Sequence, residues 1–195
     1  MDTERSLIFS DSFVISCGTI TLDAARRRVL LIHNGVLQQT YLPKGRKNRG
    51  ESLEAAAVRE TYEESGYACT LTPYHDSTSA PPLEAVVGSE DAAAPAAWRG
   101  VRHTEPIAVQ QWRHARDGVR KLIFWFVAEA DSRIPAVAGT QDVGEEHFVG
   151  RWVAYDDQTG DVLPESVSFE EDRALIRRAV EIVQRERKRG ERERA

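Results

Sequence analysis

The sequence lacks the features that secreted and membrane-spanning proteins need. It has two cysteines, Cys17 and Cys69, in 195 residues, which is too few for a disulfide framework. No apolar run approaches the roughly 20 residues that span a bilayer, and residues 1–5 lead into no signal-like apolar segment. We therefore expect a soluble protein of the cytoplasm. A nuclear location stays open because the C-terminal tail is rich in Arg and Lys.

An excess of positive charge is also missing. Lys and Arg number 26 against 31 Asp and Glu, so the net charge is −5, which argues against a broad nucleic-acid-binding surface. A local basic pocket is still compatible with this balance, because basic and acidic residues segregate along the chain. Hydrophobic and charged contents of 41% and 29% are globular values. We expect a single domain over residues 1–195.

Apolar runs and turn residues predict strands before and after a central helix. The expected strands are 13–22, 28–33, 67–74, 105–114, 119–130 and 148–155. Residues 51–65 read as a helix, with Gly66 as its left-handed C-terminal stop. This order predicts an α/β fold with a mixed sheet covered by helices.

Two further segments complete the predicted organisation. Residues 76–97 are rich in Ser, Ala, Pro and Gly and predict a flexible insertion. Residues 168–195 predict a charged helix and tail, in which Ser168 and Glu171 form a capping box and the chain frays from Arg185 onward.

The helix predicted at 51–65 carries charge against local rules. Glu60, Glu63 and Glu64 stand at i, i+3 and i+4 and share one face, where like charges destabilise a helix. Two of them occupy the last turn, which favours Lys or Arg. Such violations tend to mark functional sites. A bound cation would compensate, and carboxylate oxygens suit Mg²⁺ or Mn²⁺. A solvated acidic face is the alternative.

A basic loop lies directly upstream of this helix. Lys44, Arg46, Lys47 and Arg49 stand around Gly45. Lys and Arg bind phosphate through charge-assisted hydrogen bonds, so these residues predict a substrate with several phosphates. Alternatively, Lys47 and Arg49 only offset the nearby glutamates.

Together the two segments resemble the Nudix box of the Nudix hydrolases. That pattern is Gly, five residues, Glu, seven residues, Arg-Glu, an aliphatic, any residue, Glu-Glu, any residue, Gly and an aliphatic. The matching residues are Gly45, Glu51, Arg59, Glu60, Glu63, Glu64 and Gly66. Thr61 and Tyr67 stand where aliphatic residues are usual. Both are packing positions, so the chemistry is not affected.

The resemblance implies an α/β/α sandwich and a metal-dependent hydrolase of phosphoanhydride bonds. It implies that Glu60, Glu63 and Glu64 bind Mg²⁺ or Mn²⁺ together with the Gly45 carbonyl. It also implies that Arg59 orients these glutamates through a salt bridge. The metal would polarise phosphoryl oxygens and lower the pKa of the attacking water.

The general base stays open at this point. Glu60 is one candidate. Some family members instead use a glutamate on a loop before a late strand, and Glu145 and Glu146 precede the strand expected at 148–155. A solvated loop is the alternative for these two residues.

The Pro43-Lys44-Gly45 opening is similar to Nudix enzymes that act on diphosphoinositol polyphosphates and dinucleoside polyphosphates. We expect a substrate of this type, bound by Gly45 and the four basic residues of the loop. Hydrolysis of mRNA caps or of nucleoside diphosphate derivatives stays an alternative, as does a non-catalytic phospholigand sensor. RNA is less favoured because no RNA-binding module is visible, and the oligomeric state is open.

Residues outside the box offer weaker signals. Trp112 could stack on a nucleobase, whereas Trp125 and Trp152 are expected in the core. Arg120 and Lys121 could extend a phosphate pocket, although nothing in the sequence brings them there.

Overall fold

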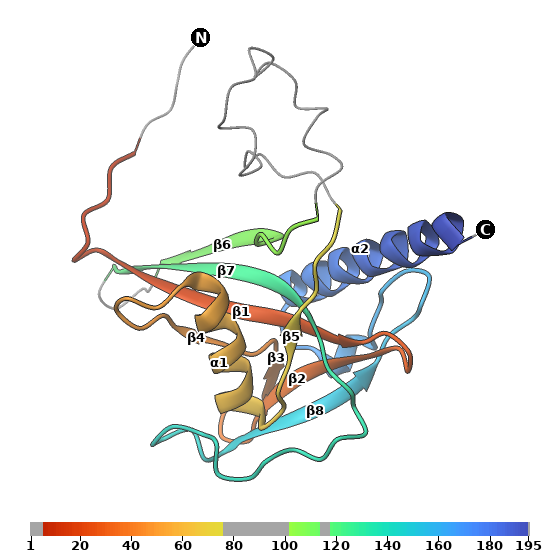
Figure 1. Ribbon diagram of the computed structural model, residues 1–195. Coiled ribbons are helices and arrows are strands. Elements are labelled where there is room, and N and C mark those ends of the chain that lie inside the picture. The colour runs from red at the N-terminus through yellow and green to blue at the C-terminus, as the bar shows by residue number, and fades with distance from the viewer. Residues whose placement is uncertain (1–5, 76–101, 114–117, 195) are drawn as a thin grey trace, which may run out of the picture.

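The computed structural model describes residues 6–75, 102–113 and 118–194, which form eight strands and two α-helices (Figure 1). The strands are β1 (Phe13–Asp23), β2 (Arg28–Asn34), β3 (Gln39–Tyr41), β4 (Lys44–Arg46), β5 (Thr70–Leu71), β6 (Ala108–Arg113), β7 (Arg120–Glu129) and β8 (Phe148–Ala154). The helices are α1 (Leu53–Ser65) and α2 (Glu170–Arg194), and Pro164–Ser166 forms a short 3-10 helix. No helix in these ranges is both long and apolar enough to cross a membrane.

The strands form one mixed sheet around β1. Its main order is β3-β2-β1-β7-β5, and β4, β6 and β8 pair with β1, β7 and β2 respectively. β1 and β7 run parallel from Phe13↔Arg120 to Leu22↔Glu129, whereas the other strand pairs are antiparallel. The predicted mixed sheet is therefore confirmed.

Alternation along β7 divides the core between the two faces of the sheet. Ile123 and Trp125 belong to the larger apolar cluster, which includes the buried face of α2. Phe124 and Phe126 belong to the smaller cluster, which includes α1. Because successive strand residues point to opposite faces, α1 and α2 cover opposite sides. This is the expected α/β/α sandwich, and Trp125 is fully buried as predicted.

The ends of α1 follow from specific caps. The Ser52 hydroxyl accepts from the Ala55 N–H, so the helix begins at Leu53. The expectation that Glu51 lies in the first turn is therefore wrong. Gly66 has a left-handed φ of 75°, and its N–H donates to the Tyr62 carbonyl, which confirms the predicted stop.

The C-terminal helix differs from the prediction at both ends. It begins at Glu170, and the hydroxyl of Ser168 accepts from the Thr40 N–H on β3, so the predicted capping box is wrong. The helix continues to Arg194, so the expected fraying from Arg185 is also wrong. Ion pairs along its exposed side, such as Arg189 with Glu193 at 3.1 Å, support these last turns.

The strand expected at 67–74 is mostly absent. Only Thr70–Leu71 pairs with β7, and Tyr74 forms an isolated bridge with His103. Pro73 lies between these pairings and has no N–H for a ladder. The predicted insertion at 76–97 lies outside the described residues.

Candidate active site

Small residues bring α1 close to the sheet. Ala56 and Ala57 are fully buried and pack with Cys17 of β1 and Phe126 of β7. The same buried face of the helix also carries Glu60 and Glu64, which lie against β4. Gly45 of β4 lies so close to α1 that an added Cβ would stand 1.7 Å from the Glu60 Oε2 atom. With Glu60 in this position, only a residue without a side chain fits at 45.

The carboxylates of α1 are withdrawn from solvent to different degrees. Glu64 and Glu60 are buried, with 4% and 8% of their surface exposed. Glu64 Oε2 accepts from the Lys44 N–H at 2.8 Å. The charge of Lys44 and this hydrogen bond do not offset the burial, which raises the pKa of Glu64 to about 8. Burial also raises the pKa of Glu60.

Arg59 links Glu51 to two glutamates of α1. Its Nε and Nη2 atoms donate to the two carboxylate oxygens of Glu51 at 2.7 and 2.9 Å. Its Nη1 donates to Glu60 at 2.8 Å and to Glu63 at 2.6 Å, and Nη2 also reaches the Arg46 carbonyl at 3.0 Å. The hydrogen bond from Arg59 lowers the pKa of Glu51. The guanidinium is therefore fixed in a position from which it orients two carboxylates.

These groups line one pocket of about 600 Å³. The predicted site residues in its wall are Lys44, Gly45, Arg46, Arg59, Glu60, Glu63 and Glu64. Lys47 and Arg49 are not among the lining residues. The Lys47 ammonium donates to the Asn48 carbonyl, and Arg49 is exposed. The structure therefore brings only part of the basic loop to the carboxylates.

The two glutamates before β8 differ in position. Glu145 lines the pocket. Glu146 is exposed, and both of its carboxylate oxygens accept from the Gly144 N–H at 3.0 Å. Of the pair, the structure thus places Glu145 and not Glu146 in the pocket wall. Burial, followed by the nearby charge of Asp142, raises the pKa of Glu145.

Sequence reasoning missed several pocket residues or could not place them. They are Tyr41, Asn48, Lys121, Asp142 and Phe148. The pKa of Lys121 is lowered to about 8. Burial is the larger cause, and the positive charge of Lys44 is the second. Lys121 comes to the pocket through the parallel pairing of β1 with β7, for which the sequence has no local signal.

The donor set of the pocket fits a divalent metal. Three carboxylates and a backbone carbonyl are hard oxygen ligands, and the charge of Lys44 does not offset the burial of the Glu64 carboxylate. In this structure the carboxylates of Glu60 and Glu63 accept hydrogen bonds from Arg59. No three His, Cys, Asp or Glu side chains within 6–75, 102–113 and 118–194 converge closely enough to hold a metal ion.

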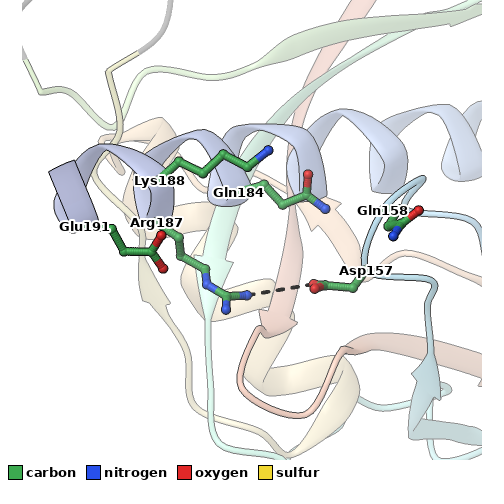
Figure 2. Close-up of a pocket in the computed structure, with 6 residues that line it drawn as sticks. All are labelled: Asp157, Gln158, Gln184, Arg187, Lys188 and Glu191. Carbon is green, nitrogen blue, oxygen red and sulfur yellow. Dashed lines mark ion pairs between the residues drawn. The ribbon is translucent and has the colours of Figure 1, made fainter.

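A second pocket, of about 400 Å³, lies beside the C-terminal half of α2 (Figure 2). None of the predicted site residues lines it. Arg187 approaches Asp157 to 3.8 Å across this pocket. Because its charges are of both signs and partly paired, it offers no concentrated site for an anion or a metal.

Comparison with known proteins agrees with the geometry. The family model of the NUDIX domain matches residues 13–172, whereas no curated protein matches the chain. A NUDIX-family hydrolase of Clostridium perfringens has a similar structure, with a TM-score of 0.55 and 16% identity over 90% of this chain and 99% of that chain.

Two further structures are less similar. A NUDIX hydrolase of Nitrosomonas europaea has a TM-score of 0.49 and 15% identity over 88% of each chain. A MutT NUDIX hydrolase of Burkholderia pseudomallei has a TM-score of 0.49 and 20% identity over 88% of this chain and 98% of that chain. Of the three structures, only the first has a TM-score above 0.5 and supports the fold. At these sequence identities, none of them indicates a substrate.

Proposed function

The chain belongs to the Nudix family of hydrolases, and on that premise we propose that it is a Mg²⁺- or Mn²⁺-dependent pyrophosphohydrolase of a highly phosphorylated small molecule. We propose diphosphoinositol polyphosphates or dinucleoside polyphosphates as the substrate class. One observation carries the proposal: the same pocket holds the α1 carboxylates and, besides Arg59, three basic side chains, Lys44, Arg46 and Lys121. A metal and several phosphates therefore have partners side by side.

In this proposal the carboxylates of Glu60, Glu63 and Glu64 and the carbonyl of Gly45 would hold the metal. The bound metal would supply charge to polarise a phosphoryl oxygen and acidify a water molecule. Arg59 acts as a positioning residue, since its contacts with Glu60 and Glu63 keep both carboxylates on the pocket side.

Basic residues of the pocket would bind the phosphates that stay on the products. Lys44 and Arg46 flank Gly45 on β4, and Lys121 approaches from β7. Lys47 and Arg49 lie outside the pocket wall, so we assign them at most a contribution to the local positive field.

Glu145 is the better candidate for a base outside the box. It lines the pocket, whereas Glu146 is exposed and bound to the Gly144 N–H. A carboxylate in the pocket wall is positioned to accept a proton from an attacking water. Glu60 remains the other candidate for this role.

The proposal is tested with a panel of compounds in the presence of Mg²⁺. The panel contains diphosphoinositol pentakisphosphate, diadenosine tetraphosphate, ADP-ribose and capped RNA, and each reaction is scored for phosphate-containing products. We expect turnover of at least one compound. Glu64→Gln should lower kcat at least about a hundredfold, because it removes a charge that stabilises the transition state.

Two outcomes would contradict this proposal. One is turnover by Glu64→Gln within threefold of the wild type, which would reject Glu64 as a metal ligand. The other is thermal stabilisation by these compounds without any product, which would instead favour a non-catalytic sensor. Circular dichroism of the variant verifies that its fold is intact.

A further inference from the structure

An accessible aromatic ring lies beside the basic side of the pocket. Trp112 on β6 is the Cα partner of Lys121 on β7, so both side chains stand on the same face of the sheet. The ammonium groups of Lys121 and Lys44 lie 5.6 and 5.8 Å from the centroid of the Trp112 ring. Trp112 is 40% exposed. Both lysines line the pocket, so the indole lies next to two residues of its wall.

Gly18 allows Lys44 to lie on this face. It pairs with Lys44 across β1–β4 and with Trp125 across β1–β7. An added Cβ would stand 2.8 Å from the Lys44 Cβ and 2.6 Å from the Trp125 ring, closer than real contacts allow. The missing side chain therefore leaves room beside Gly18 for both the Lys44 Cβ and the Trp125 ring. Lys44 then reaches outward between Trp112 and Tyr41, whose ring centroid is 4.3 Å from its ammonium.

Both lysines lack a salt bridge, since neither Lys44 nor Lys121 forms an ion pair with another described residue. Lys121 is only partly exposed, and its neighbours include a second ammonium. The charges of Glu60 and Glu64 act on Lys121, and Lys44 acts on Glu64 and Glu145, but none of these carboxylates forms an ion pair with either lysine. The two partly buried ammonium groups repel each other, and a bound anion relieves this repulsion. The arrangement is thus suited to an anion that lies next to an aromatic surface.

We propose that Lys44, Lys121 and Trp112 form a subsite for the nucleoside-phosphate part of the substrate. The inference rests on the proposed hydrolase function and narrows it. The ammonium groups bind a phosphate outside the hydrolysed bond, and the exposed indole stacks on the nucleobase. The substrate is then a nucleoside or dinucleoside polyphosphate.

The indole separates this class from inositol pyrophosphates. A nucleobase has a flat π face that stacks on an aromatic side chain. An inositol polyphosphate has no such face and carries phosphates around its whole ring. At the position of Trp112 it would need another cation.

Kinetics of Trp112 variants test the subsite. Trp112→Leu keeps an apolar side chain but removes the flat ring. We expect it to raise the KM for diadenosine tetraphosphate at least about tenfold, as stacking energies imply, with kcat within threefold. Trp112→Phe should restore the KM to within threefold of the wild type. Val109→Ala, an exposed apolar residue on the same strand, is the matched control and should change neither constant.

A second variant separates the phosphate contact from the base contact. Lys121→Met should raise the KM for diadenosine tetraphosphate and for diphosphoinositol pentakisphosphate alike, because both carry the anion. Trp112→Leu should raise it only for the nucleotide. Lys188→Met, an exposed lysine of α2, removes the same charge away from the pocket. It should leave both values unchanged.

A binding measurement gives a readout that does not depend on turnover. Tryptophan fluorescence of the wild type should be quenched by ADP with Mg²⁺, and the quenching should be lost in Trp112→Phe. Quenching that persists in this variant, or a KM in Trp112→Leu that is unchanged or rises equally for both compounds, would overturn the subsite. Hydrolysis of the inositol compound without any nucleotide would overturn it while the hydrolase stands. Inactivity toward every compound would overturn the hydrolase itself.

Discussion

Gly45→Ala is the most direct perturbation of the proposed metal site, because it alters no charge. The added Cβ would lie 1.7 Å from Glu60 Oε2, 2.1 Å from Cδ and 2.7 Å from Oε1. Gly45 does not have a left-handed φ, so alanine is compatible with the backbone itself. The clash must therefore be relieved by movement of the Glu60 carboxylate, which is the flexible end of its side chain.

The cost of this movement follows from what Glu60 contacts. Its carboxylate would leave the charge-assisted hydrogen bond from Arg59 Nη1, now 2.8 Å long, which is worth about 1.5–3 kcal/mol. For a domain of this size, such a loss lowers the Tm by roughly 3–12 °C. Displacement of a proposed metal ligand by about 1 Å or more should lower kcat about a hundredfold and weaken metal affinity.

The assay compares Gly45→Ala with Gly190→Ala. Gly190 lies within α2 and a Cβ there meets nothing within 4 Å, so alanine should stabilise the helix by up to about 1 kcal/mol and leave activity unchanged. Turnover of the best panel compound, Mn²⁺ binding by calorimetry and thermal unfolding are measured on both variants. Turnover and Mn²⁺ affinity of Gly45→Ala within threefold of the wild type would refute the reasoning.

Two further predictions concern carboxylates outside α1. Glu145→Gln should lower kcat at least about tenfold while Glu146→Gln stays within threefold; equal effects of the two changes on turnover would contradict the assignment. Asp172 is buried, accepts from the Leu42 N–H at 3.0 Å and has its pKa raised from 3.8 to about 6 by burial. Its contribution to stability is therefore complete below pH 3.8 and is lost as the pH rises through about 6, by up to about 3 kcal/mol. Urea unfolding should show the stability of the wild type falling relative to Asp172→Asn between pH 4 and 7, and a constant difference would exclude this linkage.

The sequence predicted those parts of the site that depend on short spacings. Glu60, Glu63 and Glu64 belong to one helix, whose 3.6-residue period places them on one face wherever the helix lies. Gly45 and its neighbours could be joined to that helix through the Nudix resemblance. The predicted pocket wall is therefore mostly present in the structure.

Spacing could not place residues that reach the pocket through long-range pairing. Lys121 depends on the parallel alignment of β1 with β7, and Trp112 depends on its register opposite Lys121. Neither relation has a local signal in the chain. Closeness in sequence was also a poor guide to the pocket. Lys47 and Arg49 are near the pocket residues in the chain but do not line the pocket. There the chain leaves β4 toward Gly50, whose left-handed φ of 76° turns it into α1.

The two departures from the Nudix pattern are explained by packing. Thr61 replaces an aliphatic residue at a fully buried position, where its hydroxyl donates to the Ala57 carbonyl at 2.8 Å and bonds to Thr19 at 2.7 Å. Thr19 in turn bonds to Thr21 at 2.6 Å, so β1 supplies the polar partners that a buried hydroxyl needs.

Tyr67 also has a packing partner that suits it, in this case an aromatic one. It lies just beyond the stop of α1, and its ring meets Trp152 of β8 edge to face, with centroids 5.5 Å apart. An aliphatic residue at 61 or 67 would therefore fit only with matching changes on β1 or β8. Neither Thr61 nor Tyr67 lines the pocket, and none of their partners Thr19, Ala57 and Trp152 does. The departures thus belong to the core of this chain, and they give no reason to doubt the chemistry that the carboxylates support.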